Sequence, residues 1–98
     1  MSKVIFSIKY DIQPEKREEY LVVVRELKNL IKADGLESYS VFELKGKQNT
    51  FQEIYLFTNK EAFEDFDDDP DDRTNILMNK LTDMIKQQST EYTTLYEI

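Results

Sequence analysis

Carboxylates, lysines and tyrosines are the side chains available for proton transfer in this 98-residue chain, which contains no histidine and no cysteine. The lack of cysteine excludes a disulfide scaffold, a thiol nucleophile and a thiolate zinc site. The lack of histidine removes the usual general base near neutral pH and the usual haem ligand. Acid–base catalysis would therefore use Glu, Asp, Lys or Tyr, and we expect no metal and no cofactor.

Glu53 is the carboxylate of greatest catalytic interest. It lies on an expected strand together with Phe51, Tyr55 and Phe57. If it faces a pocket among these rings, loss of water would raise its pKa and make it a candidate base. The alternative is an outward-facing strand residue in solvent, and the sequence alone favours that alternative.

Aromatic side chains are numerous, with six tyrosines and six phenylalanines. Ligand pockets are mostly apolar with a few converging polar groups, and inward tyrosine hydroxyls would supply both. The alternative is that these are ordinary strand residues with exposed tips. The candidates for a small-molecule site are Tyr10, Tyr39, Tyr55, Phe57, Phe66, Tyr92 and Tyr96.

An acidic run occupies residues 64–72, where seven of nine side chains are Asp or Glu. Clustered oxygens can bind Ca²⁺ or Mg²⁺, but the alternating acids and central glycine of an EF-hand loop are missing. We favour a solvated turn in which Asp69 and Asp71 cap the next helix, with Pro70 at its first position.

The net charge of −7 and the pI near 4.6 argue against nucleic acid as a partner. The basic residues are scattered among acids, so the sequence shows no polybasic membrane patch. No apolar run is long enough to span a bilayer, and the first residues lack the apolar core of a signal peptide. We therefore expect a cytoplasmic protein.

Alternating apolar residues predict strands at residues 3–12, 36–45, 50–57 and 90–98. The turn at residues 46–49 should join the middle two as an antiparallel hairpin. A first helix is predicted to begin at Pro14 and to end at Gly35 as a left-handed cap. The resulting order is β-α-β-β-α-β, an α+β ferredoxin-like fold in one domain covering residues 1–98.

The second helical region is predicted to be split near Pro70, because the residue before a proline avoids the helical conformation. Thr58 and Glu61 have the spacing of a capping box at its start. After the break, the buried stripe is expected to contain Ile76, Leu77, Leu81, Met84 and Ile85.

Both faces of the expected sheet carry apolar side chains. Ile54 and Leu56 point to one side, and Phe51, Tyr55 and Phe57 to the other. The helices can cover only one face, so we expect a homodimer that pairs through its sheet faces. The alternative is a monomer whose sheet edges and loops hide these side chains.

Two parts of the sequence are similar to a known family. They are the strand at residues 4–10 with the segment at 13–20, and the aromatic strand with its capped helix at 51–63. Over nearly the whole chain the sequence resembles the dimeric α+β barrel superfamily, and within it the antibiotic-biosynthesis-monooxygenase-like (ABM) domains. The resemblance implies the fold, the dimer and a pocket in each subunit between sheet and helices.

This sequence departs from the catalytic pattern of that family. Oxidising or haem-degrading members use Trp and Asn with Arg or His, whereas this chain has no Trp and no His. Leu56 and Phe57 occupy the strand where such members often carry Trp, and Phe66 occupies the position of a frequent His. No catalytic group or haem ligand therefore transfers to a residue of this chain.

Three hypotheses follow. The first is a dimeric barrel protein that binds a small apolar or aromatic ligand. The second is a cofactor-independent monooxygenase in which Tyr and Glu replace the usual residues. The third is a non-catalytic protein-interaction module. An open pocket in which Glu53 or tyrosine hydroxyls converge would favour the first two, and a closed pocket would favour the third.

Overall fold

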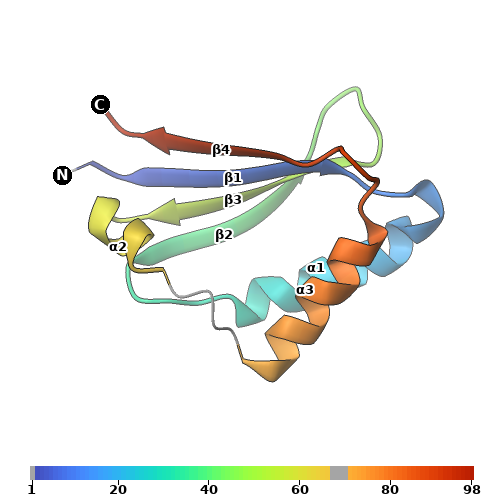
Figure 1. Cartoon of the computed structure of the whole chain (residues 1–98), viewed down its shortest axis with the longest axis horizontal. Helices are drawn as coiled ribbons and strands as arrows, with labels where there is room; N and C mark the ends of the chain where they lie inside the picture. Colours follow the sequence, from blue (N-terminus) through green and yellow to red (C-terminus); the bar gives the residue numbers. More distant parts are fainter. Residues whose placement is uncertain (1, 67–70) are drawn as a thin grey trace.

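The computed structural model describes residues 2–66 and 71–98 (Figure 1). Its elements alternate as the sequence predicts, with a 3₁₀ turn at Pro14–Lys16 before the first helix. They are β1 (Val4–Asp11), α1 (Arg17–Leu30), β2 (Leu36–Glu43), β3 (Thr50–Phe57), α2 (Lys60–Glu64), α3 (Asp72–Met84) and β4 (Glu91–Tyr96).

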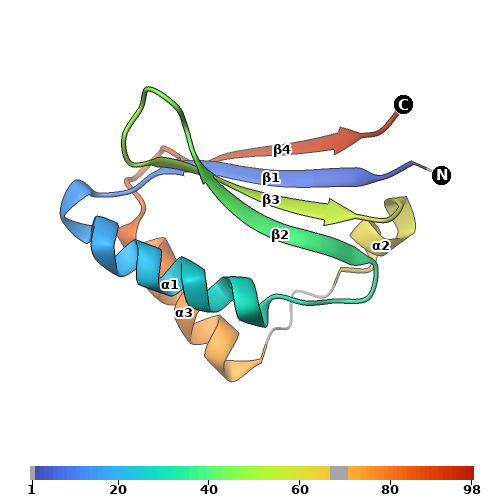
Figure 2. The same cartoon turned by 180° about the vertical axis from the view of Figure 1, so that it is seen from behind.

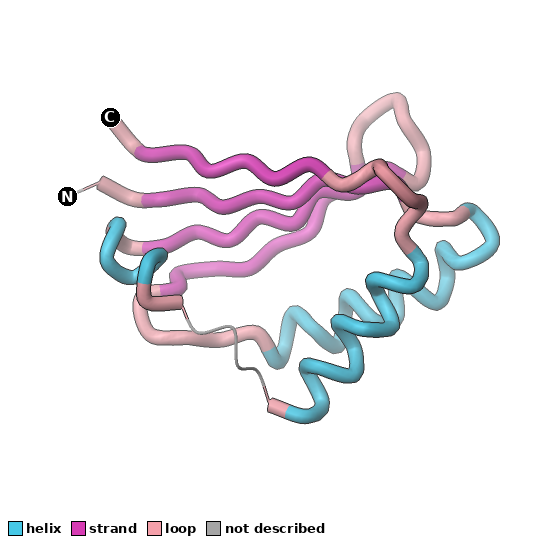
Figure 3. Tube along the Cα trace, in the orientation of Figure 1, coloured by secondary structure: helices cyan, strands magenta, loops and turns pink. Residues whose placement is uncertain are grey.

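The four strands form one antiparallel sheet in the order β2-β3-β1-β4 (Figure 2). Helices α1 and α3 lie side by side on one face of this sheet, and short α2 lies at the end near the two termini (Figures 1 and 3). The predicted α+β ferredoxin-like architecture, with its second helical region divided in two, is confirmed. Pro70, to which the division was assigned, lies outside the described residues.

Strand register decides which side chains meet under the helices. In the β1–β3 ladder, Phe6 lies opposite Tyr55, Ile8 opposite Glu53, and Tyr10 opposite Phe51. Opposed residues project to the same face. The odd-numbered residues of β3 therefore share the helix-covered face with the even-numbered residues of β1.

The core lies between this face and the two long helices. Tyr20, Val23, Val24 and Leu27 are the buried residues of α1, at the steps expected for one helical face. Helix α3 buries Leu77, Leu81 and Met84. Ile76 was predicted in the same stripe, but it is 49% exposed because its position turns it away from the sheet.

Gly35 does not cap α1, contrary to the prediction. The helix ends at Leu30, and the next residue, Ile31, is already extended with ψ of 105°. Gly35 does adopt a left-handed φ of +81°, in the turn before β2. A Cβ placed on it would lie 2.4 Å from the Cβ of Ala62, so glycine allows the β2 entrance to approach α2.

The cap of α2 lies one residue beyond the predicted position, whereas the cap of α3 is one of the residues predicted for it. Asn59, not Thr58, caps α2 by accepting a hydrogen bond from the backbone N–H of Ala62. Asp71 caps α3 by accepting from the N–H of Thr74, as predicted for that residue. Asp69 lies outside the described residues. In 2–66 and 71–98, no helix is both long and apolar enough to cross a membrane.

Candidate functional site: a buried carboxylate among tyrosines

Glu53 lies in the middle of β3, between β1 and β2, and is only 6% exposed. Its ladder partners are Ile8 on β1 and Val41 on β2. The expectation that Glu53 faces solvent is therefore wrong. Its side chain has the same strand parity as Phe51, Tyr55 and Phe57, so it must share their helix-covered face.

Tyrosine hydroxyls surround the Glu53 carboxylate. The hydroxyl of Tyr39 donates a hydrogen bond of 2.7 Å to Glu53 Oε1. Tyr10 and Tyr55 also hydrogen-bond to this carboxylate. The hydroxyl of Tyr10 lies 2.8 Å from that of Tyr20, which extends the network from the sheet to α1. A buried carboxylate requires such partners, because burying it without hydrogen bonds would cost several kcal/mol of folding stability.

Burial is the main influence on the acid–base properties of this group. Loss of water raises the pKa of Glu53, and the tyrosine hydrogen bonds to its carboxylate counter part of that rise. Burial likewise raises the pKa of Tyr10 and of Tyr39, and the nearby Glu53 charge adds to this effect. The tyrosines therefore stay protonated near neutral pH and act as donors, while Glu53 is a carboxylate of increased basicity.

A cavity of about 400 Å³ opens between the sheet and α3, with Glu53 among its lining residues. Tyr10 and Tyr55 line it beside the carboxylate, and the apolar wall includes Leu27 and Leu81. The exposed residues 86–88 and Tyr92 also line it, so the cavity opens to solvent. This volume suits a small organic molecule.

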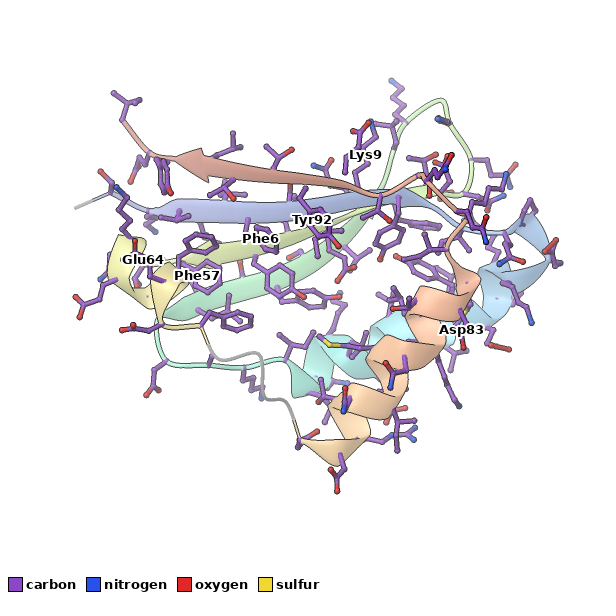
Figure 4. The ribbon with its side chains drawn as sticks, in the orientation of Figure 1. Phe6, Lys9, Phe57, Glu64, Asp83 and Tyr92 are labelled. Carbon is purple, nitrogen blue, oxygen red and sulfur yellow. The ribbon has the colours of Figure 1, made fainter. Side chains whose placement is uncertain are left out.

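A second cavity of about 520 Å³ adjoins the first, and we call it the aromatic lobe. The two share Ile8, Tyr55 and Met78 as a common wall. The remaining lining residues of the aromatic lobe are Phe6, Phe63, Glu64 and Phe66. In Figure 4, Phe6 and Phe57 point to the helix side of the sheet and Glu64 lies beside them on α2, whereas Lys9 points away.

The predicted ligand-binding residues divide into three groups. Tyr10, Tyr55 and Tyr92 line the Glu53 cavity, and Tyr55 and Phe66 line the aromatic lobe. Tyr39 and Phe57 line neither cavity and are buried beside them. Tyr96 also lines neither cavity; it is 52% exposed, with Lys60 Nζ 4.8 Å from its ring centroid.

Several residues of this region were not singled out from the sequence. Tyr20 is one of them, although it is the one buried residue of α1 with a polar tip. Met78 and Phe63 contribute to the cavity walls, but a helical apolar residue looks the same in sequence whether it lines a cavity or fills the core.

A second polar cluster lies at the turn that joins β2 to β3, and its role is structural. Arg17 donates two hydrogen bonds to Glu43, of 2.5 and 2.9 Å, and a third of 2.9 Å to the Asn49 side chain. The two bonds from Arg17 to Glu43, with one from the Asn49 backbone N–H, lower the pKa of Glu43 to about 2. Asn49 has a left-handed φ of 69°, as its predicted turn role requires.

The acidic run contributes no metal site in the part of the chain that the structure describes. No group of three Asp, Glu, His or Cys side chains among residues 2–66 and 71–98 could hold an ion. Residues 67–69 of the run are outside these ranges. Arg73, which follows the run, pairs with Glu26 of α1 at 2.5 Å and so ties α3 to α1.

Residues 3–72 match the sequence profile of the antibiotic biosynthesis monooxygenase family. The chain belongs to this family. The match covers β1 through the start of α3, including Glu53 and the tyrosines of β1, β2 and β3. The predicted resemblance to ABM-like members of the dimeric α+β barrel superfamily is thereby confirmed. No curated protein matches the chain.

Solved structures share the fold of this ABM chain at low sequence identity. A conserved protein from Methanosarcina mazei Go1 has a TM-score of 0.80 at 15% identity, covering 100% of this chain and 95% of its own. Rv0793 from Mycobacterium tuberculosis has a TM-score of 0.75 at 12% identity, covering 98% and 95%. SnoaB, a cofactor-independent oxygenase from Streptomyces nogalater, has a TM-score of 0.72 at 15% identity, covering 95% and 90%.

Proposed function

We propose that this ABM-family chain binds a small aromatic molecule with an ionisable hydroxyl in the Glu53 cavity, and that Glu53 is the general base that removes the hydroxyl proton. The observation that supports this most strongly is the buried carboxylate itself, open to a cavity of about 400 Å³ and held by tyrosine hydroxyls. Perturbed carboxylates in such settings are found most often at functional sites.

The proposed reaction is a cofactor-independent monooxygenation. Removing the proton makes the aromatic anion electron-rich enough to reduce O₂, so the substrate supplies the electrons itself. If a ring carbon bearing two hydrogens becomes a carbonyl, one oxygen atom remains in the product and the other leaves as water. Family membership and the fold shared with SnoaB support this class of reaction.

The cavity favours a ligand-binding role over a purely structural one. An interaction module has no need of an accessible cavity with a buried carboxylate at its wall, because burying that charge costs stability. Tyr10 and Tyr55 line the same cavity as Glu53, where their hydroxyl oxygens can accept a hydrogen bond from a ligand hydroxyl. The geometry therefore supports ligand binding with Glu and Tyr in place of the Trp and His that the chain lacks.

The proposal includes a homodimer that pairs through the uncovered face of the sheet. This face presents Phe42, which is 59% exposed, and Leu95, which is 53% exposed. Ile5, Ile54 and Leu56 project to the same side and are partly exposed. A second copy of the sheet would remove these side chains from water. Sedimentation at micromolar concentration should give the mass of a dimer, and Phe42→Asp should give the mass of a monomer.

Oxygen uptake tests the catalytic part. A panel of anthrones and dihydroxynaphthalenes should include compounds that the protein oxidises with O₂ uptake above the rate of spontaneous oxidation. Glu53→Gln should reduce the enzymatic rate by at least about a hundredfold, the lower limit typical of a general base. Glu91→Gln, which removes an exposed charge on β4, is the matched control and should leave the rate unchanged. Equal rates for the wild type and Glu53→Gln would refute Glu53 as the base.

A further inference from the structure

The rings around the aromatic lobe make a closed series of contacts. Phe6 lies 5.8 Å from Tyr55 between ring centroids, and Tyr55 lies 5.8 Å from Phe66. Phe66 lies 5.3 Å from Phe57, Phe57 lies 5.5 Å from Phe63, and Phe63 returns to Phe6 at 5.9 Å. Phe57 is fully buried beneath the others, and the other four rings line the lobe.

The rings are inclined to one another and do not lie in a flat stack. The interplanar angles are 44° for Phe6 and Tyr55, 39° for Phe6 and Phe63, and 60° for Tyr55 and Phe66. The four lining rings come from β1, β3, α2 and the residue that follows the turn after α2, so they border the lobe from different elements. Phe6, Phe63 and Phe66 are each only partly buried, so solvent reaches the lobe.

The charge at the aromatic lobe is negative. Glu64 is its only charged lining residue among those the structure describes, and neither Lys nor Arg is among them. Ring faces carry a negative quadrupole, which attracts cations. The neighbouring cavity is lined by Lys86 as well as Glu53 and adds no clear charge of its own, but the whole chain has a net charge of −7. These features together favour a cation over a neutral or anionic group.

We infer that the aromatic lobe is a binding site for a small organic cation, a protonated or quaternary ammonium group held against Phe6, Tyr55, Phe63 and Phe66 with Glu64 at its side. The inference concerns the lobe alone and stands whether or not Glu53 acts as a base. A ligand spanning both cavities would carry an aromatic hydroxyl at one end and an ammonium at the other, and this last step rests on the proposed function.

Choline and 3,3-dimethylbutan-1-ol test this inference, because they have the same shape and differ in a charged nitrogen or a neutral carbon. Each is titrated into the protein at physiological salt and followed by proton NMR. Choline should bind saturably, with its methyl signals shifted upfield by the rings, and its dissociation constant should be about fivefold or more below that of the alcohol.

Variants of the lobe locate the binding. Phe63→Leu and Phe66→Leu each keep an apolar side chain but remove a ring. Each should therefore weaken the affinity for choline roughly threefold or more and change the affinity for the alcohol by no more than about twofold. Glu64→Gln should weaken choline, whereas Glu61→Gln should not. Glu61 lies in the first turn of the same helix, outside the lobe, and is the matched loss of one charge. A melting curve for each variant confirms that it folds.

Three results would overturn the inference. Equal affinity for choline and the alcohol would make the lobe a simple apolar cavity. No saturable shift for either compound would mean that the lobe is not a ligand site. A preference for choline that survives both Phe63→Leu and Phe66→Leu would place the cation elsewhere. Neither compound is an aromatic substrate, so failure here leaves the oxygen-uptake test of Glu53 standing.

Discussion

Replacing Tyr39 with Phe removes one hydroxyl from the buried network and leaves the ring in place. That hydroxyl donates the 2.7 Å hydrogen bond to Glu53 Oε1, and both side chains are less than a tenth exposed. A hydrogen bond to a charged group contributes about 1.5–3 kcal/mol to stability, against roughly 0.5–1.5 kcal/mol for a neutral pair. We therefore expect Tyr39→Phe to lower the free energy of unfolding by about 1.5–3 kcal/mol when Glu53 is ionised, and by less when it is protonated.

The pH dependence of this loss follows from the raised pKa of Glu53. Between the ordinary carboxyl pKa of about 4.3 and the raised folded-state value, the native state holds a proton that the unfolded state has released. The contribution of Glu53 to stability is therefore fully present below the ordinary value and is lost as pH rises through the folded-state pKa. Because Tyr39→Phe weakens the ionised state most, its loss of stability should grow as pH rises through the folded-state pKa of Glu53, where native Glu53 ionises.

Urea unfolding across a series of pH values measures both effects. Tyr96→Phe is the matched control, since it makes the same chemical change at a ring that is 52% exposed and lines neither cavity. The control should stay within about 0.5 kcal/mol of the wild type. A Tyr39→Phe protein as stable as the wild type at every pH would refute the network, and a loss that does not change with pH would refute the assignment of its acceptor to an ionising Glu53.

Two further predictions concern the frame that holds the site. Gly35→Ala and Gly46→Ala both place a side chain at a left-handed φ, of +81° and +84°, but only the first meets another atom, the Cβ of Ala62 at 2.4 Å. In urea unfolding, Gly46→Ala should lower the free energy of unfolding by about 1–2 kcal/mol, and Gly35→Ala should lower it by roughly 1–3 kcal/mol more. Equal losses for the two variants would contradict the close approach of Gly35 to Ala62. Arg17→Met should raise the pKa of Glu43 from about 2 toward the ordinary value, because it removes the largest cause of the depression. In the wild type, the stability that Glu43 contributes is present above the ordinary pKa of about 4.3 and is lost as pH falls toward 2. The Arg17→Met protein should therefore lose less stability than the wild type over that pH range. An NMR titration in which the pKa of Glu43 stays near 2 in the variant would contradict this.

The sequence predicted the elements well because they depend on local periodicity. The alternation in residues 4–11 and 50–57 identifies two strands, and the strand parity of Phe51, Tyr55 and Phe57 identifies the covered face. Glu53 has that same parity, but the general preference of carboxylates for solvent outweighed it in the sequence argument. That preference fails here because tyrosines from β1, β2 and β3 supply the hydrogen bonds that burial requires.

Features that depend on contacts between distant segments could not be predicted. The left-handed conformation of Gly35 was predicted, but its packing against Ala62 of α2 depends on how the chain enters β2. Tyr96 has the strand parity of a covered residue, yet it lies on an edge strand, where the Lys60 side chain of α2 meets its ring and leaves it 52% exposed. The cytoplasmic location and the single-domain organisation remain predictions from the sequence.

The comparison of 1-naphthol with 1-methylnaphthalene by isothermal titration calorimetry tests the central claim most directly. The two ligands fill a cavity similarly, but only the naphthol can donate a hydrogen bond to Glu53. The wild type should bind the naphthol at least about tenfold more tightly, the effect expected of one hydrogen bond to a charged group. In Glu53→Gln this preference should fall to a few-fold or less. Equal affinity in the wild type, or a preference undiminished in Glu53→Gln, would contradict a ligand hydroxyl bound by the buried carboxylate.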